Sequence, residues 1–189
     1  MANLKAKSLN PWKKISSKEI YQNEWLRLRE DQVITPGGKQ GIYGVVETTP
    51  AIAIVPLTSN LETYLIGQYR YTLDVYSWEI PEGGASQDES PLEAAKRELR
   101  EETGLKAKKW TPLSSLYTSN SITNEIAYIY LAEELIMGKQ MPDHTEELDV
   151  KIIPFMDVYQ KVLRYEIKDA LAIIGIFRVY QYLKSEGRL

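Results

Sequence analysis

One segment, residues 90–104, constrains the fold of this chain most, because it carries its own helix start and stop signals. Ser90 suits the N-cap of a helix, Pro91 suits its first position, and Glu93 completes the spacing of a capping box. Gly104 supplies the matching stop signal. We therefore predict a helix over 90–103 that packs one apolar face against a sheet, made of Leu92, Ala95 and Leu99.

Three carboxylates gather on another face of this predicted helix. Glu98, Glu101 and Glu102 are spaced i, i+3 and i+4, and like charges at this spacing destabilise a helix by roughly 0.2–0.5 kcal/mol per pair. A solvated acidic face is the alternative, but three stacked carboxylates favour a bound cation. Oxygen ligands with no histidine or cysteine nearby favour Mg²⁺, with Mn²⁺ as a substitute. Arg97 is spaced to pair with Glu93 and Glu101, which would hold one ligand in position.

The composition excludes several classes of protein. Hydrophobic residues make up 43% and charged residues 26%, as in globular proteins. A net charge of -3 leaves no basic excess for nucleic acid, and the absence of cysteine excludes disulfides and thiolate metal sites. No apolar stretch reaches the ~18 residues of a membrane span, and the first residues lack the apolar run of a signal peptide. We expect a cytoplasmic protein that binds neither nucleic acid nor membranes.

Apolar runs and turn signals divide the chain into two regions. Residues 12–47 alternate short apolar runs with breaks at Gln22-Asn23 and at Pro36-Gly37-Gly38, which predicts a small antiparallel β meander. The apolar run 51–57 predicts a strand covered on both faces and the first arm of a hairpin that ends near Tyr71. Further strands are predicted at 77–80, 110–117, 125–132 and 148–155, and helical periodicity follows to the end. This order predicts an α/β fold with a mixed sheet between helices, divided into domains 1–47 and 48–189.

The segment 83–105 resembles the Nudix box. The fixed positions of the box are met by Gly83, Glu89, Arg97, Glu98, Leu99, Glu101, Glu102, Gly104 and Leu105. The resemblance implies the α/β/α sandwich of that family and hydrolysis of a nucleoside diphosphate derivative by attack of water at phosphorus. It also implies that Glu98 and Glu102 are the main Mg²⁺ ligands and that Glu101, oriented by Arg97, is a further ligand. The backbone carbonyl of Glu82 is implied as another ligand.

The residues before the box are similar to those of ADP-ribose pyrophosphatases and related nucleoside-diphosphate-sugar hydrolases. The similarity lies in GQYRYTLDVYSWEIPEGG, residues 67–84. It implies that Arg70 meets a diphosphate oxygen, that Glu79 meets a substrate hydroxyl or base edge, and that Trp78 packs nearby, with plain core packing as the alternative for Trp78. It also implies a homodimer joined through the N-terminal meander. A proline typical of ADP-ribose hydrolases is missing from 117–125, which leaves GDP-mannose and other sugar nucleotides equally open.

The general base in this branch is commonly a glutamate in the loop before the last strand. Glu146 occupies that place and is preferred over the adjacent Glu147. Trp25 and Tyr43 are expected in the core, with stacking on a base across the dimer as the alternative. The box alone also allows a hydrolase of dinucleoside polyphosphates or nucleoside triphosphates, or a nucleotide sensor without turnover. The complete set of three box glutamates favours an enzyme over a sensor.

Overall fold

The computed structural model describes residues 9–86, 88–138 and 147–189. The chain forms two compact units. The first contains the residues up to Thr48 together with Ser119–Glu125, and the second contains Thr49–Thr118 and Ile126–Leu189. None of the described helices is both long and apolar enough to cross a membrane.

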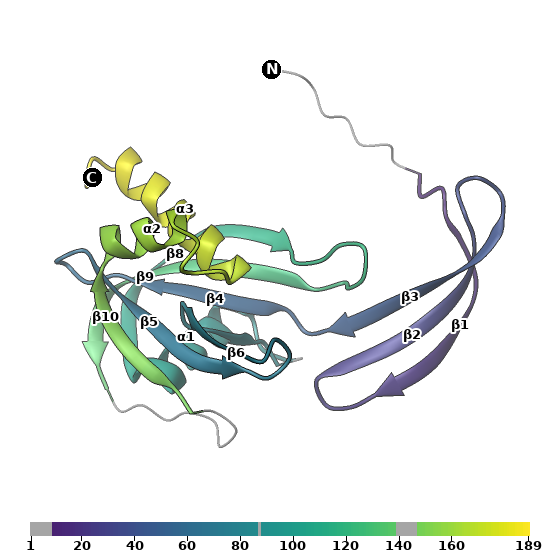
Figure 1. Ribbon diagram of the computed structural model, residues 1–189, viewed down its shortest axis with the longest axis horizontal. Helices are drawn as coiled ribbons and strands as arrows, with labels where there is room; N and C mark the ends of the chain where they lie inside the picture. The colour runs from purple at the N-terminus through teal and green to yellow at the C-terminus, as the bar shows by residue number, and fades with distance from the viewer. Residues whose placement is uncertain (1–8, 87, 139–146) are drawn as a thin grey trace. The chain divides into compact units, whose positions relative to one another are not determined.

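The first unit is the predicted antiparallel meander. It contains β1 (Lys13–Gln22), β2 (Leu26–Ile34) and β3 (Gln40–Thr48), paired in that order (Figure 1). The first turn forms because the side-chain oxygen of Asn23 accepts hydrogen bonds from the backbone of Trp25 at 2.9 Å and of Leu26 at 2.8 Å. This turn leaves Trp25 70% exposed, so the expectation that Trp25 lies in the core is wrong.

The second unit contains two sheets. One has the order β7-β4-β9-β8, formed by β7 (Glu82–Gly84), β4 (Ala51–Pro56), β9 (Ile126–Met137) and β8 (Leu105–Tyr117). It is mixed, because β4 pairs in parallel with β9 and the other pairs are antiparallel. The other sheet is antiparallel and has the order β10-β5-β6, formed by β10 (Asp149–Pro154), β5 (Glu62–Arg70) and β6 (Val75–Glu79).

The predicted hairpin over 51–71 is wrong. β4 and β5 lie in different sheets, and the bridge described between their ends joins Leu57 to Thr63. The physical reason is that β7 and β9 already occupy both edges of β4. A strand that is apolar on both faces gains most from such a central place.

Helices cover both faces of the mixed sheet. α1 (Pro91–Thr103) packs its Ala94, Ala95 and Leu99 with Ile52 and Ile54 of β4. On the other face, the alternate β4 residues share a core with α2 (Phe155–Leu163) and α3 (Ala170–Ser185). The strand is therefore buried on both faces, as predicted, and the unit is an α/β/α sandwich (Figure 1).

The predicted start and stop signals of α1 both form in the structure. The capping box between Ser90 and Glu93 is complete, and Gly104 adopts the left-handed conformation with φ 74° and donates to the Arg100 carbonyl at 2.9 Å. Leu92, predicted on the packed face, remains partly exposed. The C-terminal helical segment is divided in two, because Asp169 caps α3 by accepting a hydrogen bond from the Ala172 backbone at 2.7 Å.

Candidate active site

The box carboxylates of α1 face the short strand β7. Glu102 is 1% exposed, and its Oε2 accepts a hydrogen bond from the backbone of Glu82 at 3.0 Å. Glu98 lies directly against Gly83, where an added Cβ would stand 2.3 Å from the Glu98 carboxyl carbon. Only glycine at this position lets the strand approach the carboxylate so closely. Glu101 is more open, with 29% of its side chain exposed.

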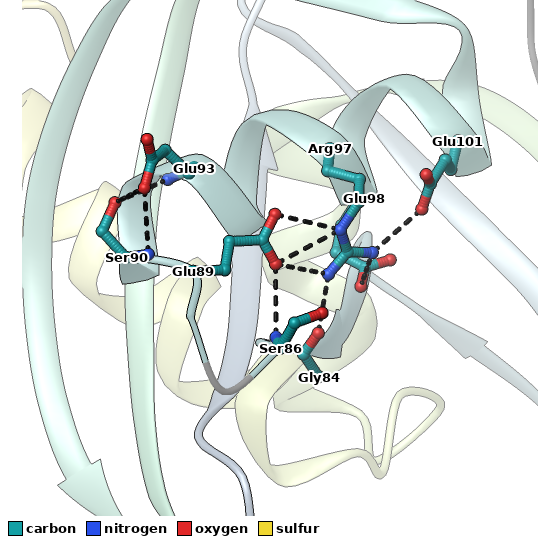
Figure 2. Close-up of polar contacts among 8 residues, drawn as sticks. All are labelled: Gly84, Ser86, Glu89, Ser90, Glu93, Arg97, Glu98 and Glu101. Atoms are coloured by element: carbon teal, nitrogen blue, oxygen red, sulfur yellow. Dashed lines mark hydrogen bonds and ion pairs between the residues drawn. The ribbon is translucent and has the colours of Figure 1, made fainter.

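Arg97 ties these carboxylates to the preceding loop (Figure 2). Its Nε and Nη2 donate to Glu89 at 3.1 and 3.0 Å, and Nη2 also donates to the Gly84 carbonyl at 2.8 Å. Its Nη1 donates to Glu98 at 2.6 Å and to Glu101 at 2.9 Å. One guanidinium therefore holds two candidate metal ligands side by side.

The protonation states fit this network. The hydrogen bonds that Arg97 donates to Glu89 and the charge of Glu98 raise the pKa of Arg97, and the same hydrogen bonds lower the pKa of Glu89. The predicted pair of Arg97 with Glu101 is present. The predicted pair of Arg97 with Glu93 is not described, because the Glu93 carboxylate accepts from the Ser90 backbone at 3.0 Å in the capping box.

A second charged cluster surrounds the side chain of Glu82, whose backbone contacts Glu102. Arg70 donates through Nε to both carboxylate oxygens of Glu79 at 3.0 Å, and its Nη2 contacts Glu79 and Glu82. Carboxylate oxygens of Glu79, Glu82 and Asp169 all lie within 4.8 Å of one another. Burial, together with the charges of Asp169 and Glu79, raises the pKa of Glu82 well above its usual range. The burial and crowding of carboxylates in this cluster therefore favour the protonated form of Glu82 beside the box.

The sequence predicts part of this cluster. Arg70 and Glu79 were expected at the site, and they are paired with each other. Glu82 was expected to act only through its backbone carbonyl, whereas its side chain also joins the cluster. Asp169 was missed, since its one signal is that of a helix N-cap and nothing in its spacing relates it to β7.

Trp78 and the loop glutamates complete the expected set. Trp78 packs against the core and forms an edge-to-face pair with Tyr76 at 5.7 Å, while the Lys151 ammonium lies 4.2 Å from its ring centre. These contacts agree with the core-packing alternative. Glu146 lies outside the described residues, and Glu147 is exposed.

The candidate metal ligands of α1 and β7 are all oxygen donors. Glu102 accepts from the Glu82 backbone, Glu98 lies against Gly83, and Arg97 joins Glu101 to Glu98. Hard divalent cations prefer such oxygen sets. The residues present therefore fit a divalent metal ion.

Comparison with known proteins settles the family. Residues 12–46 match the family model of the nucleoside diphosphate sugar hydrolase N-terminal domain, and residues 47–172 match the NUDIX domain. The chain belongs to the Nudix family. This Nudix enzyme is 37% identical to an ADP-ribose pyrophosphatase of Mycobacterium tuberculosis, over 88% of its own length and 82% of the relative's. It is 32% identical to an ADP-ribose pyrophosphatase of Bacillus subtilis, over 94% and 95% of the two chains.

A solved structure agrees with the fold. The crystal structure of an ADP compounds hydrolase superposes with a TM-score of 0.85 at 24% identity, covering 97% of this chain and 100% of that one. The α/β/α sandwich predicted from the box is thus confirmed. The Nudix enzyme is a pyrophosphatase of the branch that hydrolyses nucleoside diphosphate sugars, as its sequence predicts.

Proposed function

We propose that this enzyme hydrolyses ADP-ribose to AMP and ribose 5-phosphate and uses Mg²⁺ as its cofactor. The carrying observation is the similarity to two ADP-ribose pyrophosphatases at 37% and 32% identity over most of each chain. In the reaction the oxygen of water bonds to one phosphorus, and the bridging oxygen leaves with the other phosphate. The missing proline in 117–125 keeps GDP-mannose as the competing substrate in the test.

The box residues have two proposed roles, metal binding and the positioning of the metal ligands. Glu98, Glu101, Glu102 and the Glu82 carbonyl hold Mg²⁺, which neutralises phosphate charge and lowers the pKa of water when it is bound. Arg97 acts as a positioning residue, since its Nη1 bridges Glu98 and Glu101. Without Arg97 these two carboxylates would repel each other and separate.

Arg70 and Glu79 are the proposed substrate contacts. Glu79 is 2% exposed and orients the Arg70 guanidinium, while 34% of the Arg70 side chain remains open to a diphosphate oxygen. Burial alone would lower the pKa of Arg70, but its hydrogen bonds to Glu79 and the neighbouring carboxylates raise that pKa overall and keep Arg70 protonated. Trp78 supports β6 from the core side.

Glu146 is the proposed general base. Glu146→Gln should reduce kcat more than it raises KM, because a base that acts on water contributes little to ground-state binding. Glu147→Gln is the matched control and should be milder. A larger loss in Glu147→Gln would show that the adjacent glutamate is the base.

The N-terminal region, residues 1–47, is proposed to join two copies into a homodimer, with hydrolysis carried by residues 48–189. β1 is exposed along its whole length and carries Ile15, Ile20 and Tyr21 at 58%, 49% and 56% exposure. Exposed apolar side chains on one strand of this three-stranded sheet are candidates for burial against a second copy. Light scattering of the full chain should give a dimer, and a stable monomer would contradict this assignment.

One substrate screen tests the proposed reaction. The purified chain is incubated with Mg²⁺ and ADP-ribose, GDP-mannose, ATP or diadenosine tetraphosphate in ¹⁸O-labelled water, and the products are analysed by mass spectrometry. The proposal predicts the highest kcat/KM for ADP-ribose, with the label in one of its two phosphate products. Preference for GDP-mannose would overturn the substrate, and activity confined to ATP or the dinucleotide would overturn the reaction class.

A further inference from the structure

We propose that the outer face of α1 forms a second ligand site, which binds the phosphates of a nucleotide away from the box carboxylates. A cavity of about 530 Å³ lies between this face and the start of β8. It is lined by Lys96 and Arg100 of α1 and by Lys106 and Trp110 of β8. Small-molecule sites typically enclose roughly 300–1,000 Å³. The groove therefore has the size of a nucleotide site.

The cations of this groove have no ion-pair partner in the described part of the chain. Within residues 9–86, 88–138 and 147–189, no carboxylate oxygen lies within 4.0 Å of the charged nitrogens of Lys96, Arg100 or Lys106. The acidic residue that lines the groove, Glu93, has its carboxylate engaged by Ser90, and Lys96 acts on it only at longer range. The groove therefore gathers three cations without a described ion pair on a chain whose net charge is -3.

Stabilisation of α1 does not account for both of its groove cations, Lys96 and Arg100. Arg100 lies in the last turn of α1, where a positive charge interacts favourably with the helix dipole. Lys96 lies one turn earlier, outside the range of that effect, and at the i,i+4 spacing it repels Arg100. A bound anion removes this repulsion and accepts hydrogen bonds from both side chains.

The chemistry of the lining selects a phosphorylated ligand with a flat ring. Arginine offers a planar fork of donors to phosphate oxygens, and lysine offers a compact charge. Trp110 is held in place, because its Nε1 donates to the Ala107 carbonyl at 3.1 Å and its ring packs edge-to-face on Tyr130 at 6.2 Å. A fixed aromatic ring at the edge of a cationic groove suits a nucleobase joined to phosphates.

The cations proposed to bind the ligand are distinct from the catalytic carboxylates. Arg97 contributes to its lining, but the Arg97 guanidinium is occupied by Glu89, Glu98 and Glu101. The side chains of Lys96, Arg100 and Lys106 have no described contact with those carboxylates. Their substitution should therefore leave hydrolysis unchanged.

Without metal the box carboxylates would repel a diphosphate, so calorimetric titration in EDTA, with and without substitution of the groove cations, tests the site. The probes are ADP, adenosine and inorganic pyrophosphate. ADP should bind the wild-type chain more tightly than either of the other probes. Lys96→Gln/Arg100→Gln should weaken ADP binding at least tenfold, and Trp110→Phe should weaken it less. The control Lys108→Gln/Lys184→Gln removes the same charge from residues outside the groove and should keep wild-type affinity.

Each alternative result overturns a defined part of the proposal. Absence of ADP binding in EDTA, or equal losses in the groove and control variants, would overturn the site. Pyrophosphate that binds as tightly as ADP would overturn the nucleotide and leave a site for bare phosphate anions. The turnover of ADP-ribose with Mg²⁺ and the circular dichroism of Lys96→Gln/Arg100→Gln should match the wild type, which separates this result from failure to fold and from failure of the proposed substrate.

Discussion

Gly83→Ala gives a sharp test of how the backbone of β7 controls the carboxylates of α1. The new Cβ would stand 2.3 Å from the carboxyl carbon and Oε1 of Glu98, whereas ordinary contacts begin at 3.4 Å. The Glu98 carboxylate must therefore move by at least about 1.1 Å. The Gly83 backbone is outside the left-handed region, so alanine introduces no backbone strain.

The size of the expected effect follows from this displacement. A misplacement of ~1 Å in a catalytic constellation costs roughly 10²-fold in rate, or ~2.7 kcal/mol of transition-state stabilisation. We expect kcat for ADP-ribose at saturating Mg²⁺ to fall by about this factor. Thermal stability should change little, because the group that moves is the end of a flexible side chain.

Gly84→Ala is the matched control. Its Cβ would lie 3.5 Å from the Thr49 hydroxyl, which is an ordinary contact, and the Gly84 carbonyl that Arg97 binds is retained. Chromatographic measurement of AMP release compares the two variants, and a thermal melt checks their folding. Equal kcat in Gly83→Ala and the wild type would refute the reasoning, as would equal losses in the two alanine variants.

Two further predictions concern charge. Arg97→Gln should lower the free energy of unfolding by ~2 kcal/mol, between the ~1 kcal/mol of an exposed ion pair and the ~3–5 kcal/mol of a broken buried one. Urea denaturation measures this loss, and a change below the error of the method would contradict the bridging role. Glu82→Gln should raise the melting temperature in EDTA, by more at pH 8 than at pH 4.5. The folded-state pKa of Glu82 is raised above the usual 4.5. The stability that the Glu82 proton provides is therefore fully present below pH 4.5 and is lost as the pH rises through the folded-state pKa. Glutamine does not titrate, so the Glu82→Gln variant does not lose this stability. A difference in melting temperature between Glu82→Gln and the wild type that becomes smaller from pH 4.5 to pH 8 would contradict the raised pKa.

Local signals were sufficient for α1 and its carboxylates. Ser90, Glu93 and Gly104 determine the ends of the helix through contacts within a few residues, and helix geometry then places Glu98, Glu101 and Glu102 together. The meander was predictable for the same reason, because its turns form between neighbouring residues. These features needed no knowledge of distant parts of the chain.

Choices between distant partners could not be read from the sequence. The run 51–57 was expected to pair with the next strand, yet its neighbours are β7 and the much later β9. Asp169 reaches Glu79 and Glu82 only because α3 packs on the mixed sheet, which carries Glu82, while Glu79 ends β6 of the other sheet. Such encounters depend on tertiary packing of both elements, and no spacing within either segment encodes them.

The metal role of the box carboxylates is the central claim, and Glu98→Gln tests it most directly. The substitution preserves size while removing the charge of a carboxylate that lies against Gly83 and is 12% exposed. We predict that kcat for ADP-ribose at saturating Mg²⁺ falls by roughly 10²–10³-fold with an unchanged circular dichroism spectrum. Turnover near the wild-type value under the same conditions would contradict the assignment of Glu98 as a metal ligand.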